Sequence, residues 1–384
     1  MPGMRVVVVG GGVLGCMHAW YAAERGHQVV HLEREAAARG ASLRNFGLVW
    51  VSGRAAGAEL ELALEARRRW DEVAARVPGV GLRSGGSITV ATSEEQLGLL
   101  AEAASLPDAA ERQFSLLDPQ GVRQVNPELQ GEVRGGLWCR ADALVEPRQV
   151  PAALRIALQE RPGYRWLPGT DVVELGKRAV RDARGRWYAG DLVLLCTGAA
   201  HGGVATAHLA APALRRVRLQ MMQTAPDTRR LSTSVADNDS LRYYPAYRRT
   251  GLEALGPQPE ASARWGAQLL LAQRLDGSLT IGDTHAYAEP FDFDVREEPY
   301  EHLRSVAERV LGGPLPPTVR RWAGVYSETT DGSPYHRSQV SDGVLLVTGP
   351  GGKGMTCAPA IAARTWAAVD SDLRLEAGVR TALR

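Results

Sequence analysis

The chain has 384 residues, of which 45% are hydrophobic and 23% are charged, and its formal net charge is only +2. This length suits about two domains and a core that needs no disulfides. The near balance of charge removes the usual electrostatic reasons to expect nucleic acid or an anionic membrane as a partner. The composition therefore indicates an ordinary globular protein with neither of these partners.

The four cysteines stand far apart, without the paired spacing of a zinc site or a dithiol, so we expect reduced thiols and no metal. No basic flank leads into a long apolar segment at the N-terminus, and no apolar run approaches the ~20 residues that span a bilayer. These features predict a cytoplasmic protein.

The N-terminal segment carries a glycine motif between a predicted strand and a predicted helix. Residues 6–9 form a continuous apolar run, and Gly10, Gly12 and Gly15 follow with the spacing GxGxxG at the start of a helix predicted over residues 13–25. In a dinucleotide fold, the first glycine makes a tight turn, the second lets a pyrophosphate approach the helix N-terminus, and the third lets helix and strand pack closely.

A second strand and an acidic residue complete this pattern. Gly26 has the place of a left-handed helix cap, residues 28–32 predict a strand, and Glu33 ends it with a carboxylate that can accept hydrogen bonds from ribose hydroxyls. The residues expected to contact a dinucleotide here are Gly10, Gly12, Val13, Leu14, Gly15, Glu33 and Arg34.

The segment that begins at Glu33 distinguishes FAD from NAD. It reads EREAAARGASLRNFG, and it resembles the D-amino acid oxidase family of FAD-dependent amine oxidoreductases, which includes glycine oxidase and sarcosine oxidase. In that family a small residue and a serine, followed by Arg or Asn, carry FAD from its pyrophosphate towards the flavin, and Ser42, Arg44 and Asn45 stand in those places. The resemblance implies FAD, whereas an NAD-linked dehydrogenase would explain the first motif alone.

Three later segments extend the resemblance, at residues 170–175, 190–199 and 343–366. It implies that the backbone near Val173 contacts the adenine, that Thr197 and Gly198 close the nucleotide fold against the cofactor, and that the last helix points its N-terminus at the flavin pyrimidine. A helix dipole stabilises an anion by ~0.3 to 1 kcal/mol when exposed and up to ~2 when partly buried, and Lys353 adds a full charge. The contacts expected in the last segment are Gly349, Gly351, Gly352, Lys353, Gly354, Met355 and Thr356.

The predicted fold is α/β, with a Rossmann-like FAD-binding domain of the glutathione reductase type and a substrate domain built on a mostly antiparallel sheet. The FAD-binding domain is discontinuous and takes residues 1–80, 145–210 and 318–384, and the substrate domain takes residues 81–144 and 211–317. In the substrate domain the pattern predicts strands at 87–91, 135–139, 242–247, 268–273 and 278–282, a helix at 94–104 and a surface loop at 251–264.

The sequence also departs from the family it resembles. Residues 324–334 align with the pattern GxRPxTPDGxP, but the arginine that grips a substrate α-carboxylate is replaced by Tyr326, which cannot reproduce the two-point grip of a guanidinium. Gly324 stands where sarcosine oxidases carry a cysteine bonded to FAD, so non-covalent FAD is expected. Thr280 stands where those oxidases place a lysine over the flavin, so fast reaction with oxygen is not implied.

These departures predict a small amine whose acidic group is not an α-carboxylate. The stretches ASLRNFGLVW, RYYPAY, IGDTHAY and GGKGM together resemble a subgroup associated with aminophosphonate breakdown, which implies 2-aminoethylphosphonate or an N-methyl or hydroxy relative. Lysine suits phosphonate oxygens and also a flavin carbonyl, so both roles stay open for Lys353. Candidate catalytic residues are Lys353, His285 and Tyr326, and candidate substrate-binding residues are Trp50, Arg242, Tyr244, His285 and Tyr326.

The predicted reaction is an FAD-dependent oxidation of a C–N bond, with His285 as the preferred residue to bind the amine or accept its proton. Hydrolysis of the imine then gives an aldehyde or keto product with ammonia or an amine, and oxygen, reduced to H2O2, is the expected acceptor. The alternatives are a flavin dehydrogenase with a quinone or a carrier protein as acceptor, an enzyme for glycine- or sarcosine-like amino acids, and a non-catalytic flavin-binding subunit. The oligomeric state stays open.

Overall fold

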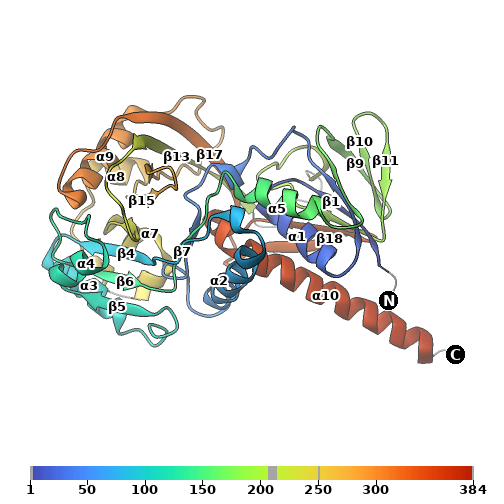
Figure 1. The fold of residues 1–384 in the computed structure, drawn as a ribbon, viewed down its shortest axis with the longest axis horizontal. Coiled ribbons are helices and arrows are strands. Elements are labelled where there is room, and N and C mark those ends of the chain that lie inside the picture. The colour runs from blue at the N-terminus through green and yellow to red at the C-terminus, as the bar shows by residue number, and fades with distance from the viewer. Residues whose placement is uncertain (1–2, 206–213, 250, 383–384) are drawn as a thin grey trace.

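The computed structural model describes residues 3–205, 214–249 and 251–382, and Figure 1 shows two lobes that lie side by side. One lobe carries a six-stranded, mostly parallel sheet with helices, and the other carries an eight-stranded, mostly antiparallel sheet. The predicted fold class is therefore confirmed. The ends of the predicted domain segments at residues 206–210, 211–213 and 383–384 lie outside the described residues.

The six-stranded sheet has the strand order β18-β19-β12-β1-β2-β8, and its neighbours are parallel except for β18 and β19. Its strands are β1 (Arg5–Val9), β2 (Gln28–Leu32), β8 (Tyr164–Leu167), β12 (Leu192–Leu195), β18 (His336–Ser341) and β19 (Val344–Thr348). The helices of this lobe are α1 (Val13–Glu24), α2 (Ala58–Arg76), α5 (Val150–Gln159) and α10 (Gly354–Ala382).

Strand β1 shows why a continuous apolar run suits this position. Val6 and Val8 belong to the core shared with the helices, whereas Val7 and Val9 pack in a second core with residues of a small three-stranded sheet. Successive side chains of a strand point to opposite faces, so a strand covered on both faces needs apolar residues at every position. The three-stranded sheet consists of β9 (Val172–Gly176), β10 (Ala179–Asp182) and β11 (Trp187–Ala189), and a separate pair is formed by β3 (Leu48–Val49) and β7 (Ala143–Leu144).

The eight-stranded sheet has the order β17-β13-β16-β15-β14-β4-β6-β5, and its neighbours are antiparallel except for β14 and β4. Its strands are β4 (Ser87–Ala91), β5 (Phe114–Leu117), β6 (Gly135–Cys139), β13 (Leu214–Pro226), β14 (Ser234–Ala236), β15 (Leu270–Gln273), β16 (Ser278–Gly282) and β17 (Thr318–Thr329). The helices of this lobe are α3 (Glu94–Ala104), α4 (Pro119–Val125), α7 (Asp239–Tyr243), α8 (Glu260–Trp265) and α9 (Glu297–Leu311). Strand β17 pairs along its length with β13, although the predicted boundary at residue 318 assigned it to the other domain.

Short 3-10 turns join several of these elements, namely η1 (Ala41–Leu43), η2 (Pro78–Val80), η3 (Gly203–Ala205), η4 (Pro245–Arg249), η5 (Leu252–Ala254) and η6 (Gly351–Lys353). The strand predicted at residues 242–247 is wrong, because α7 and η4 occupy this segment. A five-residue helix is too short to show a 3.6-residue period, so the alternation in RYYPAY resembled a strand. The loop predicted at 251–264 is also wrong in part, because η5 and most of α8 lie there.

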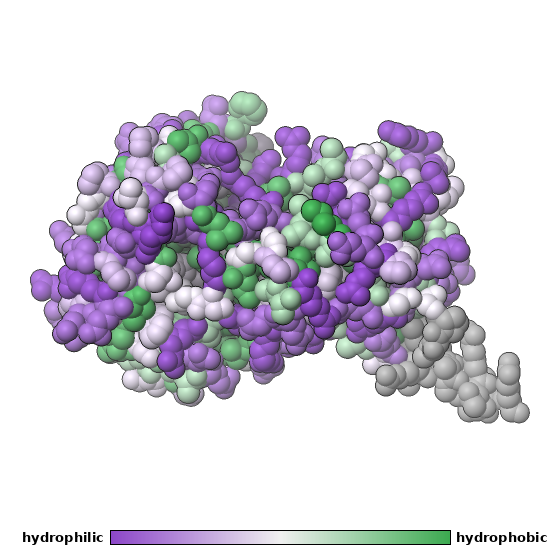
Figure 2. Space-filling view, viewed as in Figure 1, coloured by the Kyte–Doolittle hydropathy of each residue, from purple (hydrophilic) through white to green (hydrophobic). Residues whose placement is uncertain are grey.

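Hydrophilic side chains predominate on the face drawn in Figure 2, with apolar residues scattered among them. Of the helices in the described ranges, none combines the length and the apolar character needed to cross a membrane.

Candidate active site

The turn between β1 and α1 can be built only with glycine at two positions. Gly10 has a φ of 109°, and a Cβ there would lie 2.3 Å from the carbonyl oxygen of Cys196. A Cβ at Gly15 would lie 1.8 Å from the carbonyl oxygen of Gly10. The first turn of α1 therefore packs directly against the end of β1, and its N-terminal N–H groups face the space beside Gly12.

The segment around η1 lies against this helix start. The hydroxyl oxygen of Ser42 accepts a hydrogen bond of 2.9 Å from the N–H of Val13. The amide nitrogen of Asn45 donates to the carbonyl oxygens of Ala41 and Ser42 at 2.8 and 2.9 Å, and its side-chain oxygen accepts from the N–H of Gly47 at 2.7 Å. Asn45 thus stabilises the loop that carries Ser42.

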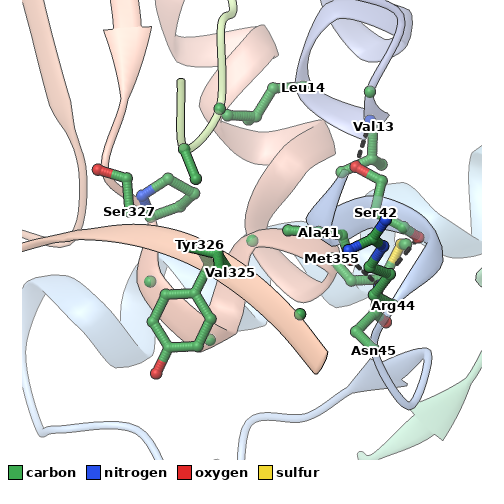
Figure 3. Close-up of a pocket in the computed structure, with 18 of the residues that line it drawn as sticks. Val13, Leu14, Ala41, Ser42, Arg44, Asn45, Val325, Tyr326, Ser327 and Met355 are labelled. Atoms are coloured by element: carbon green, nitrogen blue, oxygen red, sulfur yellow. Dashed lines mark hydrogen bonds between the residues drawn. The ribbon is translucent and has the colours of Figure 1, made fainter. Parts of the chain in front are cut away.

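A pocket with a cavity volume of about 100 Å³, partly open to solvent, lies between this loop, the end of β12, strand β17 and the glycines before α10. In Figure 3, Val13, Ser42, Arg44 and Asn45 line one side, and Tyr326 lies opposite with its hydroxyl pointing away from them. The predicted residues that line the pocket are Gly12, Val13, Leu14, Ser42, Arg44, Asn45, Gly198, Tyr326, Gly351, Gly352, Gly354 and Met355.

The other predicted residues lie outside this lining, namely Gly10, Gly15, Glu33, Arg34, Trp50, Val173, Thr197, Arg242, Tyr244, His285, Gly349, Lys353 and Thr356. The Glu33 carboxylate accepts from the N–H groups of Gly11 and Glu35 at 2.6 and 2.9 Å, which leaves further lone pairs for other donors. Val173 is 46% exposed on β9 and Arg34 is exposed. Both can therefore be reached by a ligand that extends out of the pocket past Glu33.

The pocket fits an extended dinucleotide. Gly12 keeps the α1 N-terminus free of side chains, since a Cβ there would lie 3.1 Å from the Ser42 hydroxyl oxygen. Gly349 and Gly351, with φ of 71° and 65°, form a second glycine-rich approach to the first turn of α10. The hydroxyl of Thr197 is buried without a hydrogen-bond partner among the described residues. Free helix N-termini, space without side chains and an unpaired buried hydroxyl are what a phosphate-bearing cofactor requires.

Aromatic side chains form a roof beside the pocket. The hydroxyl oxygens of Tyr243 on α7 and Tyr326 on β17 lie 3.3 Å apart, and the Tyr243 ring stacks on His285 at a centroid distance of 4.1 Å. Burial raises the pKa of both tyrosines, so both hydroxyls stay neutral at physiological pH. Nδ1 of His285 lies 3.0 Å from the Gly266 carbonyl oxygen, and Nε2 lies 3.9 Å from a carboxylate oxygen of Asp283.

Lys353 makes an ion pair that the sequence did not reveal. Its Nζ lies 3.6 Å from a carboxylate oxygen of Glu59 on α2, and the two side chains are only 16% and 15% exposed. Thr356, three residues later, donates to the Leu48 carbonyl oxygen at 3.0 Å and accepts from the Trp50 N–H at 3.2 Å. The start of α10 is therefore tied to α2 and β3.

Two residues predicted to bind substrate have their polar groups engaged elsewhere. The Arg242 guanidinium donates to the carbonyl oxygens of Leu255 and Gly256. The Trp50 indole is buried and donates to the hydroxyl oxygen of Ser234 at 3.2 Å. Tyr244 is also buried, with its ring centroid 6.0 Å from that of Trp50.

Eight residues that line the pocket were not among the predicted site residues, namely Ala41, Cys196, Ala199, Leu219, Gly324, Val325, Ser327 and Pro350. Val325 and Ser327 flank Tyr326 within the aligned segment 324–334, so that alignment contained the signal. Leu219 had no such signal, because only the pairing of β13 with β17 places it opposite Gly324.

The glycine turn, the acid at the end of β2 and the glycine-rich start of α10 define a dinucleotide-binding flavoprotein. The sequence profile of the DAO family, FAD dependent oxidoreductase, matches residues 5–367, and the chain belongs to this family. It is therefore an FAD-dependent oxidoreductase, and the residues around the pocket fit its cofactor.

Known proteins resemble this chain in part of the sequence or in the whole fold. One component of the opine oxidase from Rhizobium meliloti, its B subunit, is 31% identical over 173 residues, which is 41% of this chain and 45% of that relative. The match thus spans about half the length of that relative. Glycine oxidase from Geobacillus kaustophilus has a TM-score of 0.75 at 20% identity, over 94% of this chain and 93% of that one.

L-alpha-glycerophosphate oxidase from Mycoplasma pneumoniae, solved with FAD bound, has a TM-score of 0.72 at 17% identity, over 94% of this chain and 93% of that one. By their names, this enzyme and glycine oxidase act on different substrates. At such identities the likeness shows the fold, and the side chains of the pocket have to decide the substrate.

Proposed function

We propose that this enzyme oxidises the C–N bond of a small primary or secondary amine that bears an acidic group. The candidate substrate is 2-aminoethylphosphonate or an N-methyl or hydroxy relative. Glycine oxidase and opine oxidase, among the similar proteins, support a C–N bond as the target by their names. The pair of neutral hydroxyls at Tyr243 and Tyr326 carries the proposal for the acidic group, because each can turn its proton from their mutual 3.3 Å hydrogen bond to a phosphonate oxygen.

Bound FAD supplies the two-electron acceptor. The N-terminus of α1, Ser42 and the glycines before α10 would hold FAD, and the roof residues would face the substrate. Tyr243 and Tyr326 orient the substrate through hydrogen bonds, and the buried roof around them excludes water. Non-covalent attachment is supported by Gly324, which has no side chain, and by Cys196, whose buried thiol contacts Nδ1 of His18 and has a pKa raised by burial.

His285 is the candidate acceptor for the proton that the ammonium form must lose before oxidation. The Gly266 carbonyl oxygen beside Nδ1 favours the tautomer that is protonated there, which leaves Nε2 basic. Oxidation removes two electrons and two protons from the amine, and water then converts the imine to an aldehyde and ammonia, or to methylamine from an N-methyl substrate.

Anaerobic absorbance of the purified protein tests this function. The panel would hold 2-aminoethylphosphonate, its N-methyl derivative, β-alanine, taurine, glycine, sarcosine and propylamine. We expect a yellow protein that the phosphonates bleach fastest, with propylamine at least about 10-fold slower because it lacks the charged hydrogen-bond acceptor. A protein that none of these amines bleaches would contradict the proposal.

The electron acceptor is a separate question. We propose oxygen. Thr280 stands where related oxidases place a lysine that speeds reaction with oxygen, and its hydroxyl oxygen already accepts a hydrogen bond from Arg274 at 2.8 Å. The acceptor therefore needs a direct test. Oxygen uptake with stoichiometric H2O2 would support an oxidase. Bleaching that is reversed by a quinone and not by air would indicate a dehydrogenase. An isolated chain that binds FAD but needs a second protein for any bleaching would match the name of the opine oxidase relative, which is one component of a larger enzyme.

A further inference from the structure

A buried arginine beside the roof, Arg54, has most of its hydrogen-bonding capacity unused. The residue is only 7% exposed, its Nε donates to the Trp50 carbonyl oxygen at 3.1 Å, and its guanidinium carbon lies 5.9 Å from the centre of the Tyr244 ring. Within the described ranges, its two terminal nitrogens make no hydrogen bond, and no carboxylate lies within 4.0 Å of them. Neither nitrogen belongs to the unpaired polar atoms that are sealed from water. These N–H groups therefore keep a small solvent-accessible surface and no partner among the described residues.

In the part of the chain that the structure describes, Arg54 has no ion-pair partner within 4.0 Å. Glu59, in the first turn of α2, pairs with Lys353 at 3.6 Å. Burial lowers the pKa of Arg54, but the charge of Glu59 and its other neighbours raises it overall, so the guanidinium stays charged. Asp142 also contributes to this electrostatic stabilisation, but among the described residues no carboxylate pairs directly with Arg54. A buried charge without a direct partner is costly, so an anion that contacts Arg54 would stabilise it.

Aromatic contacts connect Arg54 to the cofactor pocket, and Lys353 adjoins the pocket through Gly352. Tyr244 contacts Tyr243 edge to face with 5.1 Å between ring centroids, and the Tyr243 hydroxyl lies 3.3 Å from that of Tyr326. A Cβ on Gly352 would lie 3.7 Å from both hydroxyl oxygens, and Gly352 lines the pocket immediately before Lys353. These contacts connect Arg54, through Tyr244 and Tyr243, to the Tyr326 hydroxyl.

We propose that Arg54 and Lys353 form an anion-binding subsite and that the acidic group of the amine substrate binds there, with the Tyr243 and Tyr326 hydroxyls as further donors to the same group. The subsite rests on the proposed function for its ligand, a phosphonate or carboxylate on a chain short enough to leave the amine at the pocket. The free edge of the guanidinium offers parallel N–H donors to two oxygens. The family arginine that Tyr326 replaces would have offered the same two donors from strand β17. Glu59 is a positioning residue, because it pairs with Lys353 and its charge competes with the ligand for both cations.

Calorimetric titration with ethylphosphonate and propionate tests the subsite without requiring turnover, since neither compound has an amine. Arg54→Met should weaken their binding by about 10- to 150-fold, the range for losing a hydrogen bond to a charged group, and Arg54→Lys should restore part of it. Glu59→Gln should act in the opposite direction and tighten binding, because it removes the competing carboxylate. Opposite signs are not expected from general damage to the fold.

Arg264→Met is the matched control. Arg264 also lies over an aromatic ring, at 5.4 Å from Trp265, and also has a carboxylate neighbour, Glu298 at 3.5 Å, but it lies on α8 away from the pocket. Its variant should bind both acids like the wild type.

Unchanged affinity in Arg54→Met with a normal FAD spectrum, or no binding by the wild-type protein, would overturn the subsite. If Arg54→Met does not fold, the subsite is tested by Arg54→Lys, which should weaken acid binding, and by Glu59→Gln, which should tighten it. Acid binding that depends on Arg54, together with no bleaching by any amine, would leave the subsite standing and reject the proposed function. If amines bleach the flavin and Arg54→Met slows acidic and neutral amines equally, the proposed function would stand and the subsite would be rejected.

Discussion

The two sides of the pocket are built in different ways. On the nucleotide side, Gly10, Gly12, Gly15, Ser42 and the glycines before α10 shape a cradle from backbone groups, with few side chains pointing inward. On the other side, Tyr243, Tyr326, His285 and Arg54 form a roof in which side chains contact one another. A dinucleotide needs free N–H groups and close approach, whereas a choice among small amines needs specific donors and charges. Changes in the cradle should therefore abolish cofactor binding, and changes in the roof should alter substrate binding while FAD stays bound.

The largest effect is expected for Gly15→Ala in the cradle. The new Cβ would lie 1.8 Å from the Gly10 carbonyl oxygen, so β1 and α1 must separate, at a cost of about 3 kcal/mol or more. We expect a protein that is purified without FAD and melts at a lower temperature. Gly98→Ala on α3 is the control, because nothing lies within 4 Å of its added Cβ and alanine favours a helix. Normal FAD content in Gly15→Ala would show that the turn tolerates expansion.

Asp237, which precedes helix α7, should make the free energy of unfolding depend on pH. Burial, with a further contribution from the charge of Asp239, raises the pKa of its carboxyl to about 8. The folded protein therefore holds this proton while the unfolded chain loses it near pH 4, so the free energy of unfolding falls as pH rises from about 4 to about 8. Within this window the loss approaches about 1.4 kcal/mol per pH unit.

Asp237→Asn stays neutral and should remove this dependence. Denaturant unfolding should show the variant to be more stable than the wild type at pH 9 and similar to it at pH 4.5, with FAD bound at both. Parallel curves for the two proteins across this range would mean that Asp237 is ionised in the folded state.

Removal of one hydroxyl from the roof should give a moderate effect on substrate binding alone. Tyr326→Phe and Tyr243→Phe should each retain FAD and weaken acidic amines by about 10-fold. The double variant should lose less than the sum of the two free energies, because the hydroxyls are 3.3 Å apart and share partners. Tyr300→Phe on α9 is the control, since its hydroxyl lies 3.5 Å from the Trp322 carbonyl oxygen, away from the pocket lining. Loss of FAD in Tyr326→Phe would remove the distinction between roof and cradle.

The smallest effect is expected for Ser42→Ala, which leaves the Val13 N–H without its 2.9 Å acceptor. Stability should fall by about 1 kcal/mol, as for other lost helix caps. Ser93→Ala removes the corresponding cap of α3, where the hydroxyl accepts from the Gln96 N–H, and should cost a similar amount. Only Ser42→Ala should also weaken FAD, measured as dissociation during dilution. Equal FAD affinity in both variants would assign Ser42 to the helix alone.

The cradle was largely readable from the sequence because its physical causes are local. A valine run predicts a strand buried on both faces, glycine spacing predicts the turn, and α1 and β2 lie where these patterns placed them. The roof was not readable in this way. The segment 242–247 forms α7 and η4 instead of a strand, because its buried tyrosines contact distant elements that no local period records.

The sequence by itself therefore determined the FAD-binding fold and the glycine positions that this fold requires. Only the tertiary structure brought Tyr243 to Tyr326, which lies 83 residues later, and joined Lys353 to Glu59 beside Arg54. The reason is that a backbone turn is decided within a few residues, whereas a charge or a hydroxyl acquires its role from whichever side chain the packed sheets and helices place next to it.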